Sequence, residues 1–550
     1  MVKRIPNKGM ASLLIILLLI VTNFILILPN LNYSPIPTEW SVGAGWGRYY
    51  IIHYGHIPRP TKALTWQSAL KNYGTIDVMP KILAATINII TGTTTLIHAE
   101  KFHRVFIWPA LIIPIFVISF LSYITRRKRY TIKILDIILL LLFSIFPLGA
   151  TLFSFSYGAS GLNPIARALF VLIMIQLMII METKFGDIKR MAIFSLLSIS
   201  FFDYYHTWSY YFIIYFIIAN LALTLTNKEQ HNVNKISIFM ASVIIMFLSI
   251  SLYLNFRLLQ QPIEFVLNIQ FILSQLNNYI SLYFRSPYIS YSVSDSMYGK
   301  LQILNGIMIL IILSIFLIHV RKKHEEKRKI HIFEKIILYF LMAQFIIYIG
   351  LFFWAGILGV YSRFFESLVY ITTLALTLLF VEASNKIRNI LRITVIISVT
   401  LAVISYLVYA PILTWSMTNG EFDGIEFAGE HIPKTSPIFS DFRYGPPLIY
   451  FNQLAITTVD SLHNSKNITL ELLNKCYYKV NNPSKILDKY INSKNYFVIV
   501  SRRQSKIPLV DPSLRRFKPA SKDFLERWNA QPGFDKIYSG EVVLFRRAVT

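Results

Sequence analysis

The chain has 550 residues, of which 55% are hydrophobic and 15% charged, with a mean hydropathy of +0.52 and a net charge of +26. This composition excludes a soluble globular protein, because a soluble fold cannot hide so much apolar surface from water. No basic and aromatic nucleic-acid module is present, so the positive charge indicates membrane surfaces and phosphate rather than nucleic acid. The sequence therefore predicts an α-helical polytopic membrane protein with the lipid bilayer as its main partner.

Apolar runs separated by charged segments predict about eleven transmembrane helices, since about 18–20 residues in a helix cross a hydrocarbon core of roughly 30 Å. The fifth run is short, and a polar stretch with Asp203 and His206 separates it from the sixth. The runs lie at residues 11–29, 105–124, 134–152, 163–181, 190–204, 208–226, 236–254, 301–320, 332–352, 365–382 and 393–411.

Lys/Arg clusters predict the orientation of these helices in the cell membrane. Such clusters precede the first run and follow the second, fourth, sixth, eighth and tenth. Because cytoplasmic loops carry the excess of Lys and Arg, we expect a cytoplasmic N-terminus and a C-terminal segment outside the cytoplasm. The first run lacks a small-residue cleavage pattern after its apolar centre and is interpreted as a retained anchor.

This topology places three large polar segments on the outer face, at about residues 30–104, 257–300 and after 411. In the first segment, "MPKILAATINIITG" (79–92) is apolar but too short to span, which favours an interfacial helix closed by Gly92. The chain is thus divided into a multi-span domain, residues 1–411, and an extracytoplasmic domain, residues 412–550.

The outer C-terminal segment has the pattern of a small α/β domain. "SPIFSD", "YFVIVS" and "FDKIYSGEVVLFRR" have strand character, the last with a Ser539-Gly540 turn between two β-rich arms. Helices are expected at "PSKILDKYIN" and "SKDFLERWNA", each opened by a residue suited to a first turn. The single cysteine, Cys476, cannot form an internal disulfide.

Ionisable residues near the outer ends of the predicted helices are the candidates for chemistry. No Gly-rich phosphate loop, zinc motif or Ser/His/Asp elbow is recognisable. An enzyme built on this sequence would therefore use carboxylates, with Arg or His to hold a phosphate. The candidate residues are Glu39, Arg48, His56, Asp77, Asp203, His206 and Arg363.

The order of these motifs resembles the GT-C class of polytopic membrane glycosyltransferases, in particular the archaeal and bacterial mannosyltransferase- or oligosaccharyltransferase-like members. An early acid follows the first span, and a long loop ends in "TINIITG" before the second. "FFDYYHTWSYYFII" looks like the short outer turn with a His in that class, and "YSRFFESLVYITTLAL" like its late arginine-bearing turn. The C-terminal "FDKIYSGEVVLFRR" resembles the closing hairpin of the outer domain.

The resemblance implies transfer of a sugar from a polyprenyl- or dolichyl-phosphate-linked donor to an acceptor on the outer face, with no particular protein, glycan or lipid acceptor indicated. Glu39 would be the general base or a metal ligand, and Asp77 a second acid. Arg363 would hold the donor phosphate, and His206, Asp203, Arg48 and His56 would bind substrate. The leaving phosphate needs Arg, His or a divalent cation such as Mg²⁺ or Mn²⁺.

Purely structural interpretations remain open for the same residues. Asp203 and His206 would cap helices at the membrane surface, and Arg363 would extend its guanidinium to the membrane interface. Asp77 would be stabilised by the dipole at the N-terminus of the following helix. The first loop has no Asp-x-Asp pair and the outer domain no Trp-Trp-Asp signature. These departures argue against an oligosaccharyltransferase proper and favour a single sugar on a monophosphate carrier.

Two other functional classes stay open. A transporter or flippase of a lipid-linked substrate would place ionisable groups near the bilayer midplane, in paired halves. A non-catalytic assembly or sensor protein would act through the outer domain alone.

Overall fold

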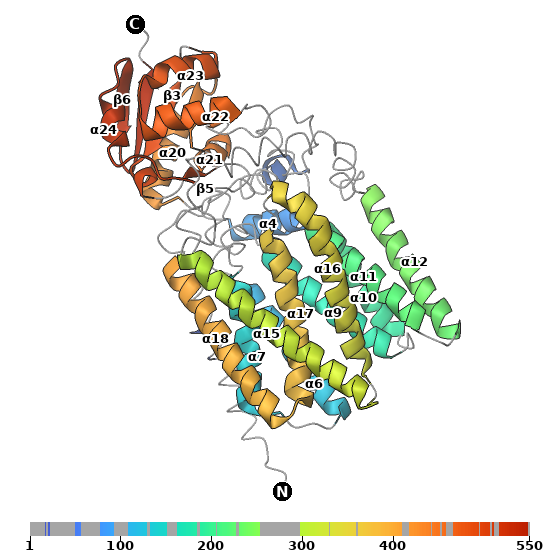
Figure 1. The fold of residues 1–550 in the computed structure, drawn as a ribbon. Helices are drawn as coiled ribbons and strands as arrows, with labels where there is room; N and C mark the ends of the chain where they lie inside the picture. The colour runs from blue at the N-terminus through green and yellow to red at the C-terminus, as the bar shows by residue number, and fades with distance from the viewer. Residues whose placement is uncertain are drawn as a thin grey trace.

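The computed structural model describes residues 17, 20–21, 50–56, 78–92, 108–128, 132–150, 162–183, 188–204, 206–226, 230–253, 297–328, 330–358, 361–409, 417–441, 443–450, 454–457, 466–493, 495–506, 509–510 and 516–547. Within these residues, ten long helices form a bundle and a five-stranded sheet lies near the C-terminus (Figure 1). The long helices are α6 (Trp108–Lys128), α7 (Ile134–Ala150), α9 (Leu162–Glu182), α10 (Ile188–Tyr204), α11 (His206–Thr226), α12 (Gln230–Tyr253), α15 (Met297–Glu325), α16 (Ile332–Leu358), α17 (Tyr361–Glu382) and α18 (Asn385–Tyr409).

These helices coincide with the second to eleventh apolar runs of the sequence. The first run falls outside the described residues except at positions 17, 20 and 21. Among the described helices, two have segments long and apolar enough to cross a membrane by themselves, Ile303–Glu325 and Asn385–Ile404. The expected total of eleven spans therefore stays a prediction, while the two segments indicate a membrane location.

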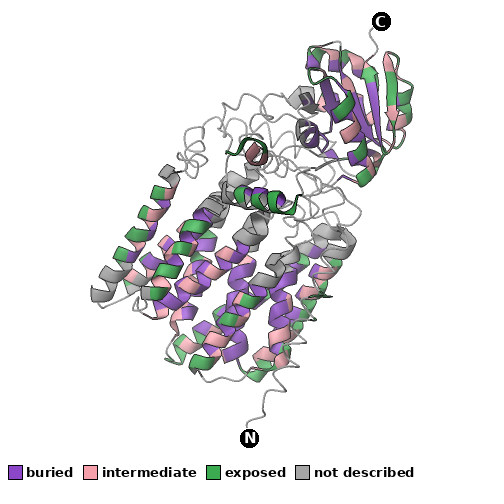
Figure 2. Ribbon diagram, turned by 180° about the vertical axis from the view of Figure 1, so that it is seen from behind, coloured by how far each residue is buried: buried purple, intermediate pink, exposed green. Residues whose placement is uncertain are grey.

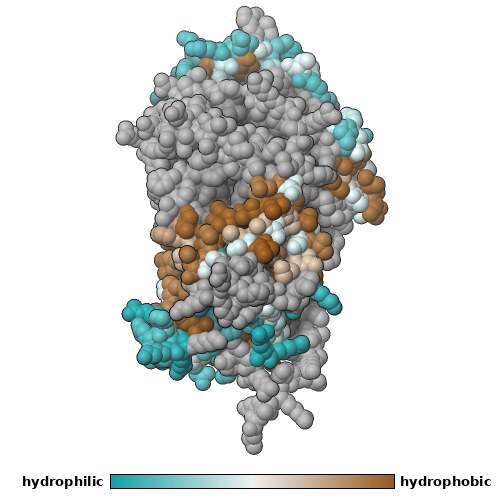
Figure 3. Space-filling view, turned by 90° about the vertical axis from the view of Figure 1, so that its right-hand side faces the viewer, coloured by the Kyte–Doolittle hydropathy of each residue, from teal (hydrophilic) through white to brown (hydrophobic). Residues whose placement is uncertain are grey.

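An apolar belt around the bundle supports that location. Large aliphatic and aromatic side chains point outward from the middle of several helices, and a water-soluble surface rarely carries so contiguous an apolar patch. Figure 3 shows this brown band between a hydrophilic zone at one end of the bundle and the hydrophilic surface of the C-terminal sheet unit. Examples on three helices are Ile318 (64% exposed), Phe345 (65%) and Ile393 (61%).

Helix α17 is the central element of the bundle. It packs against α6, α7, α15 and α16, and its residues from 367 to 383 are almost all buried. Its three buried threonine hydroxyls donate hydrogen bonds to the carbonyl oxygens four residues earlier, at 2.7–2.8 Å. Because each hydroxyl is satisfied within its own helix, these threonines can be buried in the apolar core of the bundle. Buried residues run through the interior of the bundle in Figure 2.

Ion pairs join the helix ends at one end of the bundle, which we call the basic end. Arg392 of α18 makes a bidentate contact of 2.7 and 3.1 Å with the buried Asp136 of α7. Tyr123 of α6 donates a 2.7 Å hydrogen bond to Glu182 of α9, which also pairs with Arg127. Each contact joins like ends of two helices, the N-terminal ends of α7 and α18 and the C-terminal ends of α6 and α9, so α7 runs parallel to α18 and α6 parallel to α9.

Replacing Arg392 with Leu is expected to destabilise the bundle by about 3–5 kcal/mol, because Asp136 would keep a buried and uncompensated charge. Thermal unfolding of the purified full chain in detergent measures the effect. Arg321→Leu is the matched control, since in the part of the chain that the structure describes Arg321 forms an ion pair with its exposed neighbour Glu325 alone. A thermal midpoint of Arg392→Leu equal to that of the control would contradict the prediction, and the added change Asp136→Asn should restore most of the loss.

The C-terminal unit, residues 417–547, is built on a sheet with strand order β2-β1-β3-β7-β6. Strand β1 pairs parallel with β2 and β3, and β7 pairs antiparallel with β3 and β6. The predicted strands correspond to β1, β3, β6 and β7, with Gly540 in the β6–β7 turn. The strands are β1 (Pro437–Ser440), β2 (Leu454–Thr457), β3 (Phe497–Ser501), β6 (Phe534–Ser539) and β7 (Val542–Arg547), with a separate pair β4 (Leu509–Val510) and β5 (Arg516–Phe517).

Helices cover this sheet and complete its core. The Trp528 indole donates a 2.8 Å hydrogen bond to the carbonyl of Cys476, and burial raises the pKa of the Cys476 thiol above its ordinary value. The cysteine is therefore a core residue rather than a reactive one. The helices are α20 (Asn419–His431), α21 (Gly445–Tyr450), α22 (Lys466–Leu473), α23 (Pro483–Ile491) and α24 (Phe524–Asn529).

A buried carboxylate attaches α20 to the sheet. Glu421 accepts hydrogen bonds from Tyr444 at 2.8 Å and from Ser501 at 2.5 Å, and Arg503 lies 3.4 Å away. Burial, followed by the charge of Glu421, raises the pKa of Tyr444. Glu421 is satisfied by several donors at once, as a buried charge must be, so we interpret this network as structural.

Candidate functional site

The end of the bundle opposite the basic end faces the C-terminal unit, and we call it the domain end (Figures 1 and 2). Three predicted site residues lie there by their positions in helices. Asp203 is the penultimate residue of α10, His206 is the first residue of α11, and Arg363 is the third residue of α17. Their side chains lie outside the part of the structure that is described, so their roles stay predictions.

The other predicted residues lie in the long first loop. Glu39, Arg48 and Asp77 fall outside the described residues. His56 is exposed, its Nδ1 lies 2.8 Å from the carbonyl oxygen of Tyr54, and its ring packs edge-on against Tyr50. This aromatic environment fits an interface anchor as well as a substrate contact, so the role of His56 stays a prediction.

Helix α4 (Val78–Thr91) covers the segment expected to form an interfacial helix, and it ends at Gly92, whose φ is +66°. It lies across the helix ends at the domain end and packs against α10 (Figure 1). The φ of Gly92 is the left-handed conformation that commonly ends a helix and that glycine adopts at little cost.

Helix α4 buries its polar side chains and exposes its apolar ones, which is the reverse of a helix on the surface of a soluble protein. Lys81 and Asn88 are 2% and 1% exposed, whereas Ile82 and Ile90 are 37% and 78% exposed. Positions 81, 85 and 88 share one face at helical spacing, so the polar side is buried against the protein and the apolar side faces outward. The outward apolar side is the face that an interfacial helix presents to lipid.

A buried arginine lies at the same end of the bundle. Arg167 is 1% exposed and sits five residues after the start of α9, about 7.5 Å along its axis. One turn further, Phe170 packs against Tyr215 of α11 and Tyr370 of α17, with ring centroids 5.9 Å apart in both pairs. A guanidinium enclosed by spanning helices is costly, and such residues usually serve substrate or ion binding.

Sequence reasoning missed Arg167 and Lys81 because it considered only charges at loop positions beyond the spans. The signal was present, since Arg167 interrupts an apolar run from 163 to 181 and Lys81 interrupts an apolar amphipathic segment. One further polar contact lies near this end: Ser367 of α17 donates a 2.9 Å hydrogen bond to Gln344 of α16. Two buried cations and this neutral polar pair thus lie toward the same end of the bundle.

One group of three side chains among the described residues could hold a metal ion, namely His319, Glu334 and Glu382. It lies at the basic end, where Lys323 bonds to both carboxylates. The group therefore does not fit a metal that would assist chemistry at the domain end. Glu39, the predicted metal ligand, is outside the described residues, so a divalent cation held by Glu39 stays a prediction.

The helix bundle with its interfacial helix and C-terminal sheet unit has a GT-C-like fold. In structural comparison, the chain is similar to the oligosaccharyltransferase of Archaeoglobus fulgidus, crystallised with Zn and sulfate, with a TM-score of 0.53 over 95% of this chain and 79% of that one. Their sequence identity is 10%, so this likeness concerns the fold. ArnT from Cupriavidus metallidurans is also similar, with a TM-score of 0.46, 10% identity and 98% coverage of both chains. No protein-family model and no curated protein matches the sequence.

Proposed function

We propose that this chain is a membrane glycosyltransferase that moves a sugar from a polyprenyl-phosphate-linked donor to an acceptor on the outer face of the membrane. The observation that carries the proposal is that two buried cationic residues, Lys81 and Arg167, both lie at the domain end of the bundle, in a fold similar to that of an archaeal oligosaccharyltransferase. In the orientation predicted from the Lys/Arg clusters, the domain end is the outer end and the C-terminal unit is extracytoplasmic.

The donor's shape and charge explain why these groups would lie at membrane depth. A polyprenyl phosphate has a long apolar tail and an anionic headgroup, so its site needs apolar helix surfaces that lead to fixed cations. Arg167 and Lys81 are held in the interior, and Arg363 begins α17 at the same end. Arginine suits the phosphate because its planar guanidinium can donate two parallel hydrogen bonds to phosphate oxygens.

The reaction proposed for these groups is a displacement at the anomeric carbon. Glu39 removes the proton of the acceptor hydroxyl while that oxygen forms a bond to the carbon. The bond from the carbon to the phosphate oxygen breaks, and the phosphate leaves with the electron pair. The cations of Arg167, Arg363 and Lys81 stabilise the negative charge that the leaving phosphate gains. His206 and Asp203, at the α10–α11 turn, would contact the sugar or the acceptor.

Purified full-length chain in liposomes, supplied with a labelled polyprenyl-phosphate hexose, tests the proposal. The expected result is release of polyprenyl phosphate together with transfer of the label to an added membrane extract. Movement of an unconsumed fluorescent donor across the bilayer would support the transporter alternative and contradict the enzyme. If the chain neither consumes nor moves any donor in a panel of mono- and diphosphate lipids, the non-catalytic alternative becomes the better account.

A further inference from the structure

Three helices present one metal-binding atom each at the basic end of the bundle. The atoms belong to His319 of α15, Glu334 of α16 and Glu382 of α17, and they lie within 4.8 Å of one another. His319 Nε2 is 3.9 Å from Glu334 Oε1 and 4.0 Å from Glu382 Oε2. The carboxylate side chains are 1% and 5% exposed and that of His319 is 14% exposed. The group is therefore an enclosed pocket of donors rather than an acidic surface.

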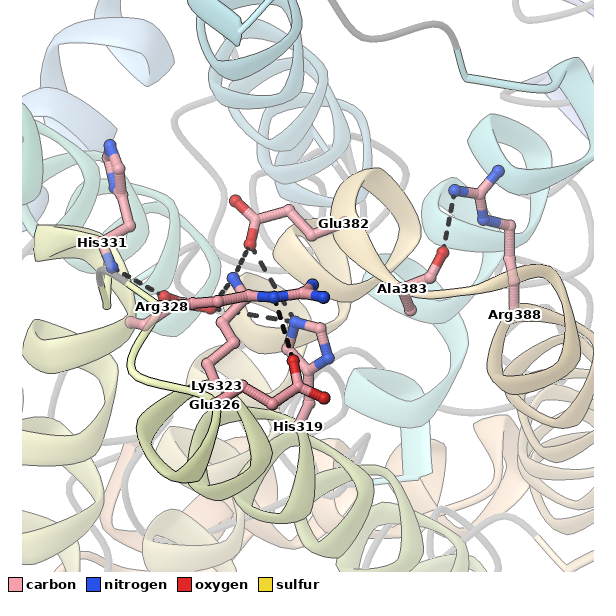
Figure 4. A network of polar contacts seen from close by, with 9 residues as sticks. His319, Lys323, Glu326, Arg328, His331, Glu382, Ala383 and Arg388 are labelled. Atoms are coloured by element: carbon pink, nitrogen blue, oxygen red, sulfur yellow. Dashed lines mark hydrogen bonds and ion pairs between the residues drawn. The ribbon is translucent and has the colours of Figure 1, made fainter.

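Lys323 shares one ammonium between the two carboxylates. Its Nζ lies 2.6 Å from Glu334 Oε1 and also bonds to Glu382 (Figure 4). His319 Nε2 is buried without a hydrogen-bond partner among the described residues, although it faces both carboxylates. A dication would neutralise both carboxylates and would also bind the imidazole nitrogen, to which Lys323 makes no hydrogen bond.

We propose that His319, Glu334 and Glu382 bind a divalent transition-metal ion, with Zn²⁺ as the preferred probe, in exchange for the Lys323 ammonium. One imidazole nitrogen and two carboxylate oxygens, with water as a fourth ligand, form a common zinc donor set. Metal–ligand distances of about 2.0–2.2 Å in a tetrahedron place neighbouring donor atoms roughly 3.3–3.6 Å apart. The His319 nitrogen needs only a small contraction from 3.9 and 4.0 Å, and the two carboxylate oxygens, which lie within 4.8 Å of each other, are brought closer by side-chain rotation.

Neighbouring groups favour this exchange. The backbone N–H of His331 donates a 2.7 Å hydrogen bond to Glu334 Oε2, which orients that carboxylate and leaves Oε1 for the metal. Lys323 has a flexible stem and lies near the end of α15, so its ammonium can move to solvent when the ion enters. A bound ion would tie α15, α16 and α17 together. Because the site lies at the end opposite the cations invoked for glycosyl transfer, this inference does not depend on the proposed function.

The test measures zinc bound to the untagged full chain in nanodiscs, by elemental analysis after equilibration at defined free Zn²⁺ concentrations. Lys323→Met removes the competing cation. This variant is expected to bind one zinc ion per chain, with an affinity for Zn²⁺ at least tenfold higher than that of the wild type. The matched control is Lys322→Met, since Lys322 lies at the adjacent position, is 70% exposed, and within the described residues forms an ion pair with Glu326 alone. That control should bind zinc as the wild type does.

A second comparison needs no lysine variant. His319→Gln, introduced into the wild-type chain, is expected to lower zinc affinity at least tenfold. Zinc binding unchanged by His319→Gln would overturn the proposal, because the ion would then bind other histidines of the chain. A folded Lys323→Met protein with wild-type affinity would also overturn it, since the ammonium would then not compete with the ion.

Discussion

Replacement of Glu39 with Gln is expected to lower the rate of sugar transfer by about 10²–10⁴-fold, the usual contribution of a general base. Glutamine keeps the size and hydrogen-bonding ability of glutamate but cannot accept the acceptor's proton at neutral pH. The loss should appear in kcat, with the KM for the lipid-linked donor little changed, because the proton transfer occurs in the transition state. Initial rates in liposomes at several donor concentrations measure both quantities.

The matched control for Glu39 is Glu100→Gln, which removes another carboxylate from the same predicted loop, residues 30–104. We assign no role in the reaction to Glu100, so this variant should retain wild-type activity. Equal kcat values for the Glu39 and Glu100 variants would contradict the role of Glu39 as the general base. Asp77 would then be the next candidate for that role.

Replacement of Arg167 with Met is expected to lower kcat by about 10²–10³-fold, the usual effect of removing one donor that stabilises charge in a transition state. Methionine preserves the apolar volume of α9 while removing the guanidinium. Arg167→Lys should recover part of the activity, because the ammonium keeps the charge but loses the paired geometry of the guanidinium. Release of polyprenyl phosphate per folded protein is the measurement.

Thermal unfolding separates this role from a purely structural one. If Arg167 binds substrate phosphate, the methionine variant should unfold close to the wild-type temperature, since an apolar side chain suits the interior of a spanning bundle. Arg190→Met, at the basic end of α10, is a control that should retain activity. A large fall in the thermal midpoint of Arg167→Met, with unchanged kcat per folded chain, would contradict the prediction.

The candidate site was only partly accessible to sequence reasoning. The positions of Asp203, His206 and Arg363 at helix ends follow from the apolar pattern, and the structure places them at one end of the bundle. Lys81 and Arg167 were not selected, because a charge within an apolar run does not reveal whether it faces lipid, a helix neighbour or a cavity. That distinction depends on which helices surround the residue.

The sequence by itself determined the local structure of this protein, because that depends on patterns within a few turns of chain. Apolar runs specify the long helices, and short continuous runs of β-branched and other apolar residues specify β3 and β7. Tertiary structure alone decided which residues meet across long separations, as with Asp136 and Arg392, 256 residues apart. It likewise turned the polar face of α4 inward and gathered His319, Glu334 and Glu382 from three helices. These outcomes depend on how complete helices pack to satisfy buried charge, which no local pattern encodes.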